Sequence, residues 1–246
     1  METKNKILKS GNAEFGYLII LALLFAILSG CSNDNPMQPA AASNGNFSLS
    51  SASSNSVPGI NQNLLQISTA KVLVKELKIY PVNDEENENH MKLVKTGPFV
   101  INMDMSSKTG IVFNTILPPG DYRMLKFEIH RVTPDETPPD PDFADANGRY
   151  SVVVKGTYNG VDFIYKSRTS AIQKDYLQKT LVVSVTSMEN ITFYAGPISW
   201  FLDENGNVLD PTLESNRHSI DDNIRDNIRN HIRLFIDDDY DGKPDN

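Results

Sequence analysis

The stretch that decides the fold is residues 149–167, RYSVVVKGTYNGVDFIYKS. An Asn-Gly pair at 159–160 separates two runs rich in β-branched and aromatic residues. This is the strongest short-range signal for a β-hairpin, because a type I′ turn requires positive φ at two successive residues. Counting outward from the turn pairs Gly156 with Phe163 and Val154 with Tyr165.

Further segments on both sides of this hairpin also predict strands. They are 70–82, 98–105, 110–116, 121–132, 179–187 and 191–198. In 121–132, period-two alternation places Leu125, Phe127 and Ile129 on one face. Many short strands joined by turn residues predict an antiparallel β-sandwich.

Two connections between these strands carry expectations of their own. Residues 98–105 and 110–116 flank the turn sequence SSKTG, so we expect them to form a hairpin. Residues 133–148 contain repeated prolines and aspartates, which exclude a helix or a central strand and predict a surface loop.

A short motif supports the predicted fold. Residues 117–122, LPPGDY, resemble the L-x-P-G-x-Y turn and strand of transthyretin-like (prealbumin-like) β-sandwich modules in bacterial surface proteins. The chain as a whole resembles bacterial lipoproteins that carry a β-sandwich domain of unknown function, over about residues 70–200. The resemblance implies a mainly β fold, a transthyretin-like or immunoglobulin-like sandwich, and it implies no activity.

The last predicted element is an amphipathic helix. Residues 219–222, SIDD, match the S/T-x-x-D/E capping signature, with acidic residues in the first turn where the helix dipole favours them. An apolar stripe follows at helical spacing, made of Ile220, Ile224, Ile228, Ile232 and Phe235. The pattern predicts a C-terminal helix of about four turns.

The chain ends in an acidic stretch, residues 235–246, FIDDDYDGKPDN. Asp237, Asp239, Asp241 and the following glycine fit D-x-[DN]-x-[DN]-G, the opening half of an EF-hand loop. Asp245 stands at the ninth position, and the backbone carbonyl of Lys243 would serve as the seventh ligand. The stretch also resembles the calcium loops of dockerins and thrombospondin type-3 repeats. The printed chain stops before the twelfth position, so we expect a partial site.

Electrostatics explains why such a loop needs a cation. Two carboxylates about 4 Å apart repel by about 4 kcal/mol at an effective dielectric constant near 20. An ordered loop therefore predicts a bound cation, and calcium is favoured because every donor is oxygen. The expected affinity is weak, with a Kd of about 10⁻⁴–10⁻³ M. The alternative is a disordered acidic tail whose charges are separated and screened by salt.

The N-terminal residues 1–30 predict a signal peptide. An uncharged apolar run at 16–28 is too short to span a bilayer, which takes about 20 residues. It ends in LSGC at 28–31, which resembles the lipobox of bacterial lipoproteins and implies acylation of Cys31. This residue is the single cysteine of the chain, so no disulfide can form within it.

These signals divide the chain into four segments. Residues 1–30 are the predicted signal peptide, and 31–63, rich in Ser, Asn, Ala and Pro, are a predicted disordered tether behind the acylated cysteine. Residues 64–214 form the predicted β-sandwich domain. Residues 215–246 hold the C-terminal helix and the acidic loop.

Composition and motifs narrow the function. A net charge of −8 argues against a nucleic-acid partner. The sequence contains no GxSxG, Walker or GxGxxG motif, so we expect that this protein is not an enzyme. Two roles stay open for Trp200: a position in the hydrophobic core, which is the commoner one, or a platform on which a sugar ring stacks.

The leading hypothesis is a lipoprotein of the cell envelope, anchored by its N-terminal lipid on the periplasmic or surface face, and in the outer membrane. Its β-sandwich would act as a non-catalytic binding or structural module whose partner is an envelope protein or a glycan. Two alternatives stay open: a fimbria-like or envelope assembly subunit that joins its partners through an exposed strand, and a glycan- or polymer-degrading enzyme.

Overall fold

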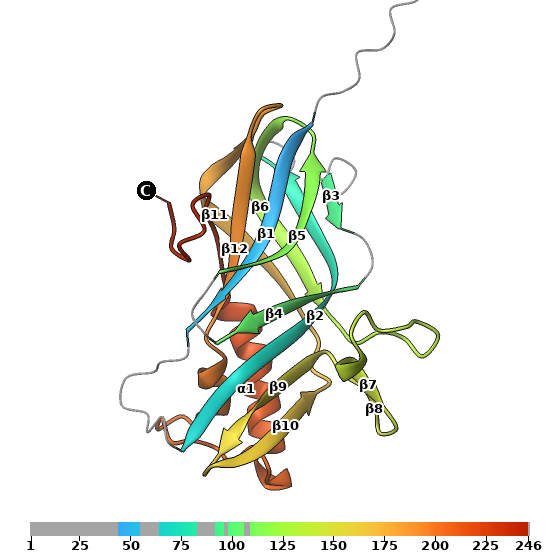
Figure 1. Cartoon of the computed structure of the whole chain (residues 1–246), viewed down its shortest axis with the longest axis vertical. Helices are drawn as coiled ribbons and strands as arrows, with labels where there is room; N and C mark the ends of the chain where they lie inside the picture. Colours follow the sequence, from blue (N-terminus) through green and yellow to red (C-terminus); the bar gives the residue numbers. More distant parts are fainter. Residues whose placement is uncertain (1–43, 55–63, 83–91, 96–97, 106–108, 246) are drawn as a thin grey trace, which may run out of the picture. The chain divides into compact units, whose positions relative to one another are not determined.

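The computed structural model describes residues 44–54, 64–82, 92–95, 98–105 and 109–245. A compact unit extends from Ala42 to Asn246. It is mainly β, dominated by antiparallel pairing, with the helix α1 (Arg217–Asn230) in its C-terminal part (Figure 1). The fold class predicted from the sequence is therefore confirmed.

The first sheet has the strand order β13-β12-β1-β5. These strands are β13 (Arg233–Ile236), β12 (Met188–Ala195), β1 (Gly45–Ser53) and β5 (Gly110–Leu117). β1 is parallel to β12 and antiparallel to β5, so the first strand of the sheet lies at its centre.

The second sheet is organised by one long strand. Its order is β10 (Val161–Ser167), β9 (Val152–Tyr158), β2 (Leu65–Pro81), β6 (Gly120–Ile129) and β11 (Ala171–Val183). The first part of β2 pairs with β9 and the second part with β6. β3 (Lys92–Lys95) and β4 (Phe99–Asp104) also pair with β2.

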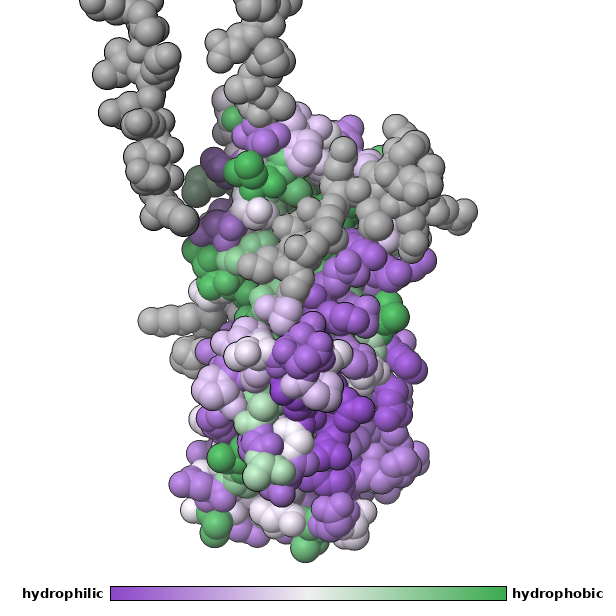
Figure 2. Space-filling view, turned by 90° about the vertical axis from the view of Figure 1, so that its right-hand side faces the viewer, coloured by the Kyte–Doolittle hydropathy of each residue, from purple (hydrophilic) through white to green (hydrophobic). Residues whose placement is uncertain are grey.

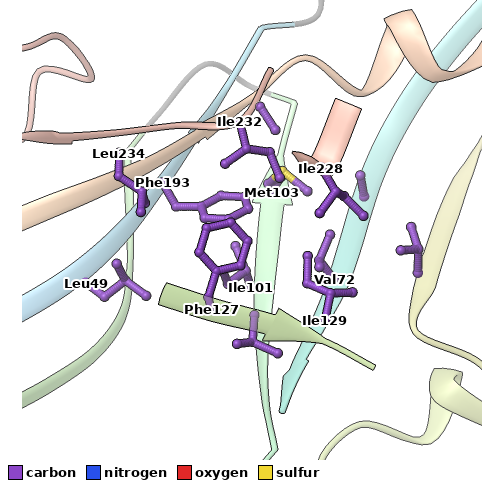
Figure 3. Packing of buried hydrophobic residues seen from close by; sticks show 14 of the residues in the cluster. Leu49, Val72, Ile101, Met103, Phe127, Ile129, Phe193, Ile228, Ile232 and Leu234 are labelled. Atoms are coloured by element: carbon purple, nitrogen blue, oxygen red, sulfur yellow. The ribbon is translucent and has the colours of Figure 1, made fainter. Parts of the chain in front are cut away.

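The core lies between the two sheets and under the helix. Phe127 of β6 and Phe193 of β12 meet edge to face across the sandwich, with ring centroids 5.6 Å apart (Figure 3). The predicted inward face of β6 is confirmed, since Leu125, Phe127 and Ile129 are all buried. Burying one such side chain contributes about 1.5–3 kcal/mol.

Side chains of β11 bridge the second sheet to β13. The Gln173 side-chain amide donates to the carbonyl of Ile232, the residue just before β13, at 3.2 Å, and the Asp175 carboxylate accepts from the N–H of Leu234 within β13 at 2.9 Å. Burial raises the pKa of Asp175. The edge of β13 thus finds hydrogen-bond partners in side chains.

The hairpin predicted at 149–167 is confirmed with its register. β9 and β10 pair Gly156 with Phe163 and Val154 with Tyr165. Asn159 and Gly160 have φ of 51° and 76°, as a type I′ turn requires.

The prediction of a disordered tether over 31–63 is wrong for residues 45–53. They form β1, whose side chains are buried except that of Asn46. Phe47 and Leu49 enter the core, while Ser48 and Ser50 occupy the opposite face. The rest of that segment (31–43 and 55–63), the predicted signal peptide and Cys31 lie outside the described residues.

The hairpin predicted between 98–105 and 110–116 is also wrong. β4 pairs with β2 in the second sheet, whereas β5 pairs with β1 in the first. The chain therefore passes from one sheet to the other between these strands.

The region 133–148 is more ordered than a plain surface loop. It contains the 3-10 helix η1 (Pro141–Phe143) and the first strand of a small hairpin, β7 (Ala144–Asp145) and β8 (Gly148–Arg149). Phe143 is fully buried, and Asp142 pairs with Lys71 and Lys155 at 2.7 Å each. Apolar and ionic contacts therefore fix much of this proline-rich segment.

The C-terminal helix differs from its prediction at both ends. It begins at Arg217, so Ser219 lies inside it, and the N-cap residue Asn216 makes no side-chain capping hydrogen bond. Ile220, Ile224 and Ile228 form the buried face. The helix ends at Asn230, and β13 follows. In the part of the chain that the structure describes, no helix is long and apolar enough to cross a membrane.

The helix packs beside another apolar element, the 3-10 helix η2 (Pro197–Phe201). Asn223 of α1 donates to the carbonyls of Trp200 and Leu202 at 3.2 and 2.6 Å. The Trp200 side chain is fully buried in the core, so it offers no platform to a ligand. A further 3-10 turn, η3 (Glu214–Asn216), leads into α1.

Candidate functional site: the C-terminal acidic loop

The acidic loop, residues 237–245, follows strand β13. The predicted apolar stripe, which runs to Phe235, would instead have brought the helix up to the loop. The N–H of Asp237 continues the pairing with β12 by donating to the carbonyl of Asn190 at 3.1 Å. The loop begins as an extension of the first sheet. Any ion here would be held by a sheet and its following loop.

Asp237, the first residue of the loop, is 0 % exposed, and its carboxylate accepts hydrogen bonds from both the loop and β12. One carboxylate oxygen accepts from the N–H of Asp241 at 3.0 Å. The other accepts from the Thr192 hydroxyl at 2.6 Å and from the N–H of Gly242 at 3.1 Å. Asp237 therefore closes the turn and ties it to β12.

A buried polar network lies under the loop, on the face of the first sheet that points away from the core. We call this the outer face. The Asn190 side-chain amide donates to the Ser50 hydroxyl at 2.9 Å and to the carbonyl of Asp237 at 2.7 Å. The Ser48 hydroxyl donates to the Asn190 side-chain carbonyl at 2.9 Å and also bonds to the Tyr240 hydroxyl at 2.9 Å. β1 and β12 thus hold the loop from below.

Three of the predicted ligands come together. Carboxylate oxygens of Asp237, Asp239 and Asp245 lie within 4.8 Å of one another, so this group could hold a metal ion. Asp241 does not join them. Its carboxylate instead accepts from the backbone N–H and the ammonium of Lys243, at 2.8 and 3.3 Å.

The electrostatics of the loop is unfavourable to ionised carboxylates. Burial raises the pKa of Asp237, and its three hydrogen bonds offset part of that rise. Burial and the charge of Asp245 raise the pKa of Asp238. Burial and the charge of Asp238 raise the pKa of Glu189 on β12. A cation at the loop would relieve this accumulation of negative charge.

A groove of about 310 Å³ adjoins the loop on the outer face. Tyr240 forms one wall, and β1, β5 and the start of β12 supply the rest, including Asn46, Ile111, Asn114 and Met188. None of these five residues stood out in the sequence. They come from four segments far apart in the chain, and only the pairing of the strands brings them together.

A second, larger pocket of about 700 Å³ lies where the N-terminal half of β2 meets β9 and β10. Its floor is apolar, with Leu65, Phe163 and Ile198, and its rim includes Lys155 and Asp162.

Figure 2 shows hydrophilic residues over most of the lower part of one face and hydrophobic residues gathered higher up. Neither a scan against protein-family models nor searches of curated proteins and of solved structures finds a match to this chain.

Proposed function

We propose that this protein is a lipoprotein of the cell envelope whose β-sandwich is a non-catalytic binding or structural module. The observation that carries the proposal is the LSGC sequence ending at Cys31, directly after an apolar run. Acylation at this cysteine would anchor the module in the outer membrane, on its periplasmic or surface face. Since β1 begins at Gly45, the 13 intervening residues allow a reach of at most about 45 Å.

Lipid labelling combined with membrane fractionation tests the anchor. Cys31→Ser should abolish acylation and move the protein to the soluble fraction. Ser29→Ala is the matched control, since it keeps a small residue beside the cleavage site and should leave labelling intact. Unchanged labelling and unchanged fractionation of Cys31→Ser would refute the lipoprotein assignment.

We further propose that calcium binds Asp237, Asp239 and Asp245 and stabilises the acidic loop. Carboxylate donors favour a hard cation. A Kd of about 10⁻³–10⁻⁴ M and 10 mM calcium would raise the free energy of unfolding by about 1.4–2.7 kcal/mol. For a domain of this size the melting temperature would rise by about 3–10 °C.

Thermal melts in calcium and in chelator test this. Asp239→Ala should remove most of the calcium-dependent rise, because Asp239 belongs to the cluster. Asp241→Ala is the matched control, since Asp241 lies outside the cluster and its loss should leave most of the rise. Identical melting temperatures of the unaltered protein in calcium and in chelator would refute the proposal that calcium binds the loop.

A second candidate function, an assembly subunit, is favoured by β5. This strand stands at the end of the first sheet's order, carries no charged residue, and leaves Ile111 and Ile116 58 % and 59 % exposed. Edge strands are normally protected by charge. Concentration-dependent polymerisation that Ile116→Lys abolishes would support assembly, and a monomer at every concentration would refute it.

A further inference from the structure

The groove beside the acidic loop is built from the outer faces of three strands and one loop residue. Asn46 of β1 lies opposite Met188 of β12, and Ser48 of β1 lies opposite Asn114 of β5. Tyr240 contributes the remaining wall. The volume of about 310 Å³ is at the lower end of the range for small-molecule sites.

The lining combines exposed amides with apolar surface. The side chains of Asn46 and Asn114 make no hydrogen bond to any residue within the described ranges. Ile111 and Met188 are 58 % and 74 % exposed. Amide groups offer both donors and acceptors, and the apolar side chains offer surface for C–H groups.

The groove is uncharged in a strongly acidic protein. No Asp, Glu, Lys or Arg lines it among the residues that the structure describes, although the chain carries a net charge of −8. An anionic ligand would find no counter-charge in this lining. A purely apolar ligand would cover the two amides without satisfying them, which costs free energy.

Tyr240 is held in place before any ligand arrives. It adopts a positive φ of 59°, and its hydroxyl bonds to Ser48 at 2.9 Å. The backbone carbonyl of Asp237 accepts from the N–H of Tyr240 at 3.3 Å, and the Asp237 carboxylate accepts from the N–H of the next residue, Asp241, at 3.0 Å. Such preorganisation lowers the entropic cost of binding, and a tyrosine ring presents a rigid apolar face with a polar end.

We propose that this groove binds a neutral glycan, whose hydroxyls pair with Asn46 and Asn114 and whose C–H faces pack on Tyr240, Ile111 and Met188. The inference rests on the proposed function as a binding module and names its ligand class. It favours a glycan over an extended peptide because the groove lies on the face of the sheet, where a peptide cannot use the strand's backbone groups.

Binding of the full-length protein, extracted in detergent, to an array of immobilised glycans tests the proposal. The array would carry neutral α- and β-glucans, mannans and chitin oligomers, with polygalacturonate and chondroitin sulfate as charged glycans. We expect at least one neutral class to bind. Asn114→Ala and Met188→Ala should each weaken that binding about tenfold without changing the melting temperature.

Ile172→Ala is the control variant, since Ile172 is an exposed residue of β11 outside the groove, and its binding should be unchanged. Absence of neutral-glycan binding, binding to charged glycans alone, or unchanged binding by both groove variants would overturn the proposal. So would capture of peptides from a parallel peptide array with no neutral glycan bound. Measuring acylation of Cys31 in the same preparation distinguishes failure of the glycan proposal from failure of the lipoprotein proposal. An acylated protein that binds no glycan refutes the glycan proposal alone.

Discussion

Phe47→Ala is the sharpest test of the fold, because it probes a strand that composition alone assigns to a tether. Phe47 lies in β1, is 1 % exposed and packs in the core that both sheets share. Truncating its ring would leave a cavity that the flanking β5 and β12 cannot fill without moving.

The expected cost is about 3–5 kcal/mol, as for other buried phenylalanines. This is a large share of the about 5–15 kcal/mol that keeps a typical domain folded. Each kcal/mol shifts the melting temperature of a domain of this size by about 2–4 °C, so we expect a fall of roughly 6–20 °C. A chain beginning at residue 64 would lose Phe47 and Leu49 together and should not fold stably.

Urea denaturation of residues 42–246, followed by circular dichroism, measures the effect. Asn46→Ala is the matched control, because its side chain is exposed on the same strand and its loss should cost less than about 0.5 kcal/mol. A Phe47→Ala variant within 1 kcal/mol of the unaltered protein would show that 45–53 do not belong to the folded core.

Two further substitutions test a close backbone contact and a titrating group. Gly156→Ala should destabilise by about 1–3 kcal/mol, because a Cβ there would overlap the carbonyl oxygen of Gln66, whereas Gly110→Ala meets nothing within 4 Å; equal urea midpoints for the two variants would contradict this. Asp238, whose pKa is raised by burial and by the charge of Asp245, binds its proton more tightly in the folded chain. The stabilisation that comes from its protonated form is therefore lost as the pH rises through that raised pKa. In calcium-free buffer, Asp238→Asn should flatten the fall in stability with pH just above about 4, and an unchanged slope in urea titrations would refute the assignment.

The hairpin of β9 and β10 was predictable because every determinant is local. Asn159 and Gly160 adopt positive φ, and the register follows from counting outward from them. The pairing of β5 was not predictable in this way, since its partner β1 lies more than fifty residues earlier. A short intervening turn sequence suggested a hairpin, but burial of apolar side chains in two different sheets outweighs proximity in the chain.

β1 and β13 were missed for a different reason. β1 is rich in serine, a residue that usually marks solvent exposure, yet its serines are buried, and Ser48 and Ser50 bond to Asn190 and Thr192 beneath the acidic loop. Just before β13, the isoleucine spacing continues the helical stripe as far as Ile232. Pairing of the following residues with β12 ends the helix at Asn230 instead.

The acidic loop was predictable in part. Alternate spacing in the motif correctly marked Asp237, Asp239 and Asp245 as a cluster. It could not reveal that Asp241 turns toward Lys243, because that depends on the bend at Gly242. The role of Tyr240 as a groove wall was likewise hidden, since it arises only where the loop meets Ser48.

The place of β1 in the first sheet has a consequence for biogenesis. This strand is synthesised first, and one of its edges can join β5 once residue 117 has emerged. Its other edge must wait for β12, whose residues lie about 140 positions later. A growing chain therefore cannot complete its core until nearly all of it has been made, and such long-range pairing slows folding. Chaperones that bind unfinished chains would meet this protein with its N-terminal strand still unprotected.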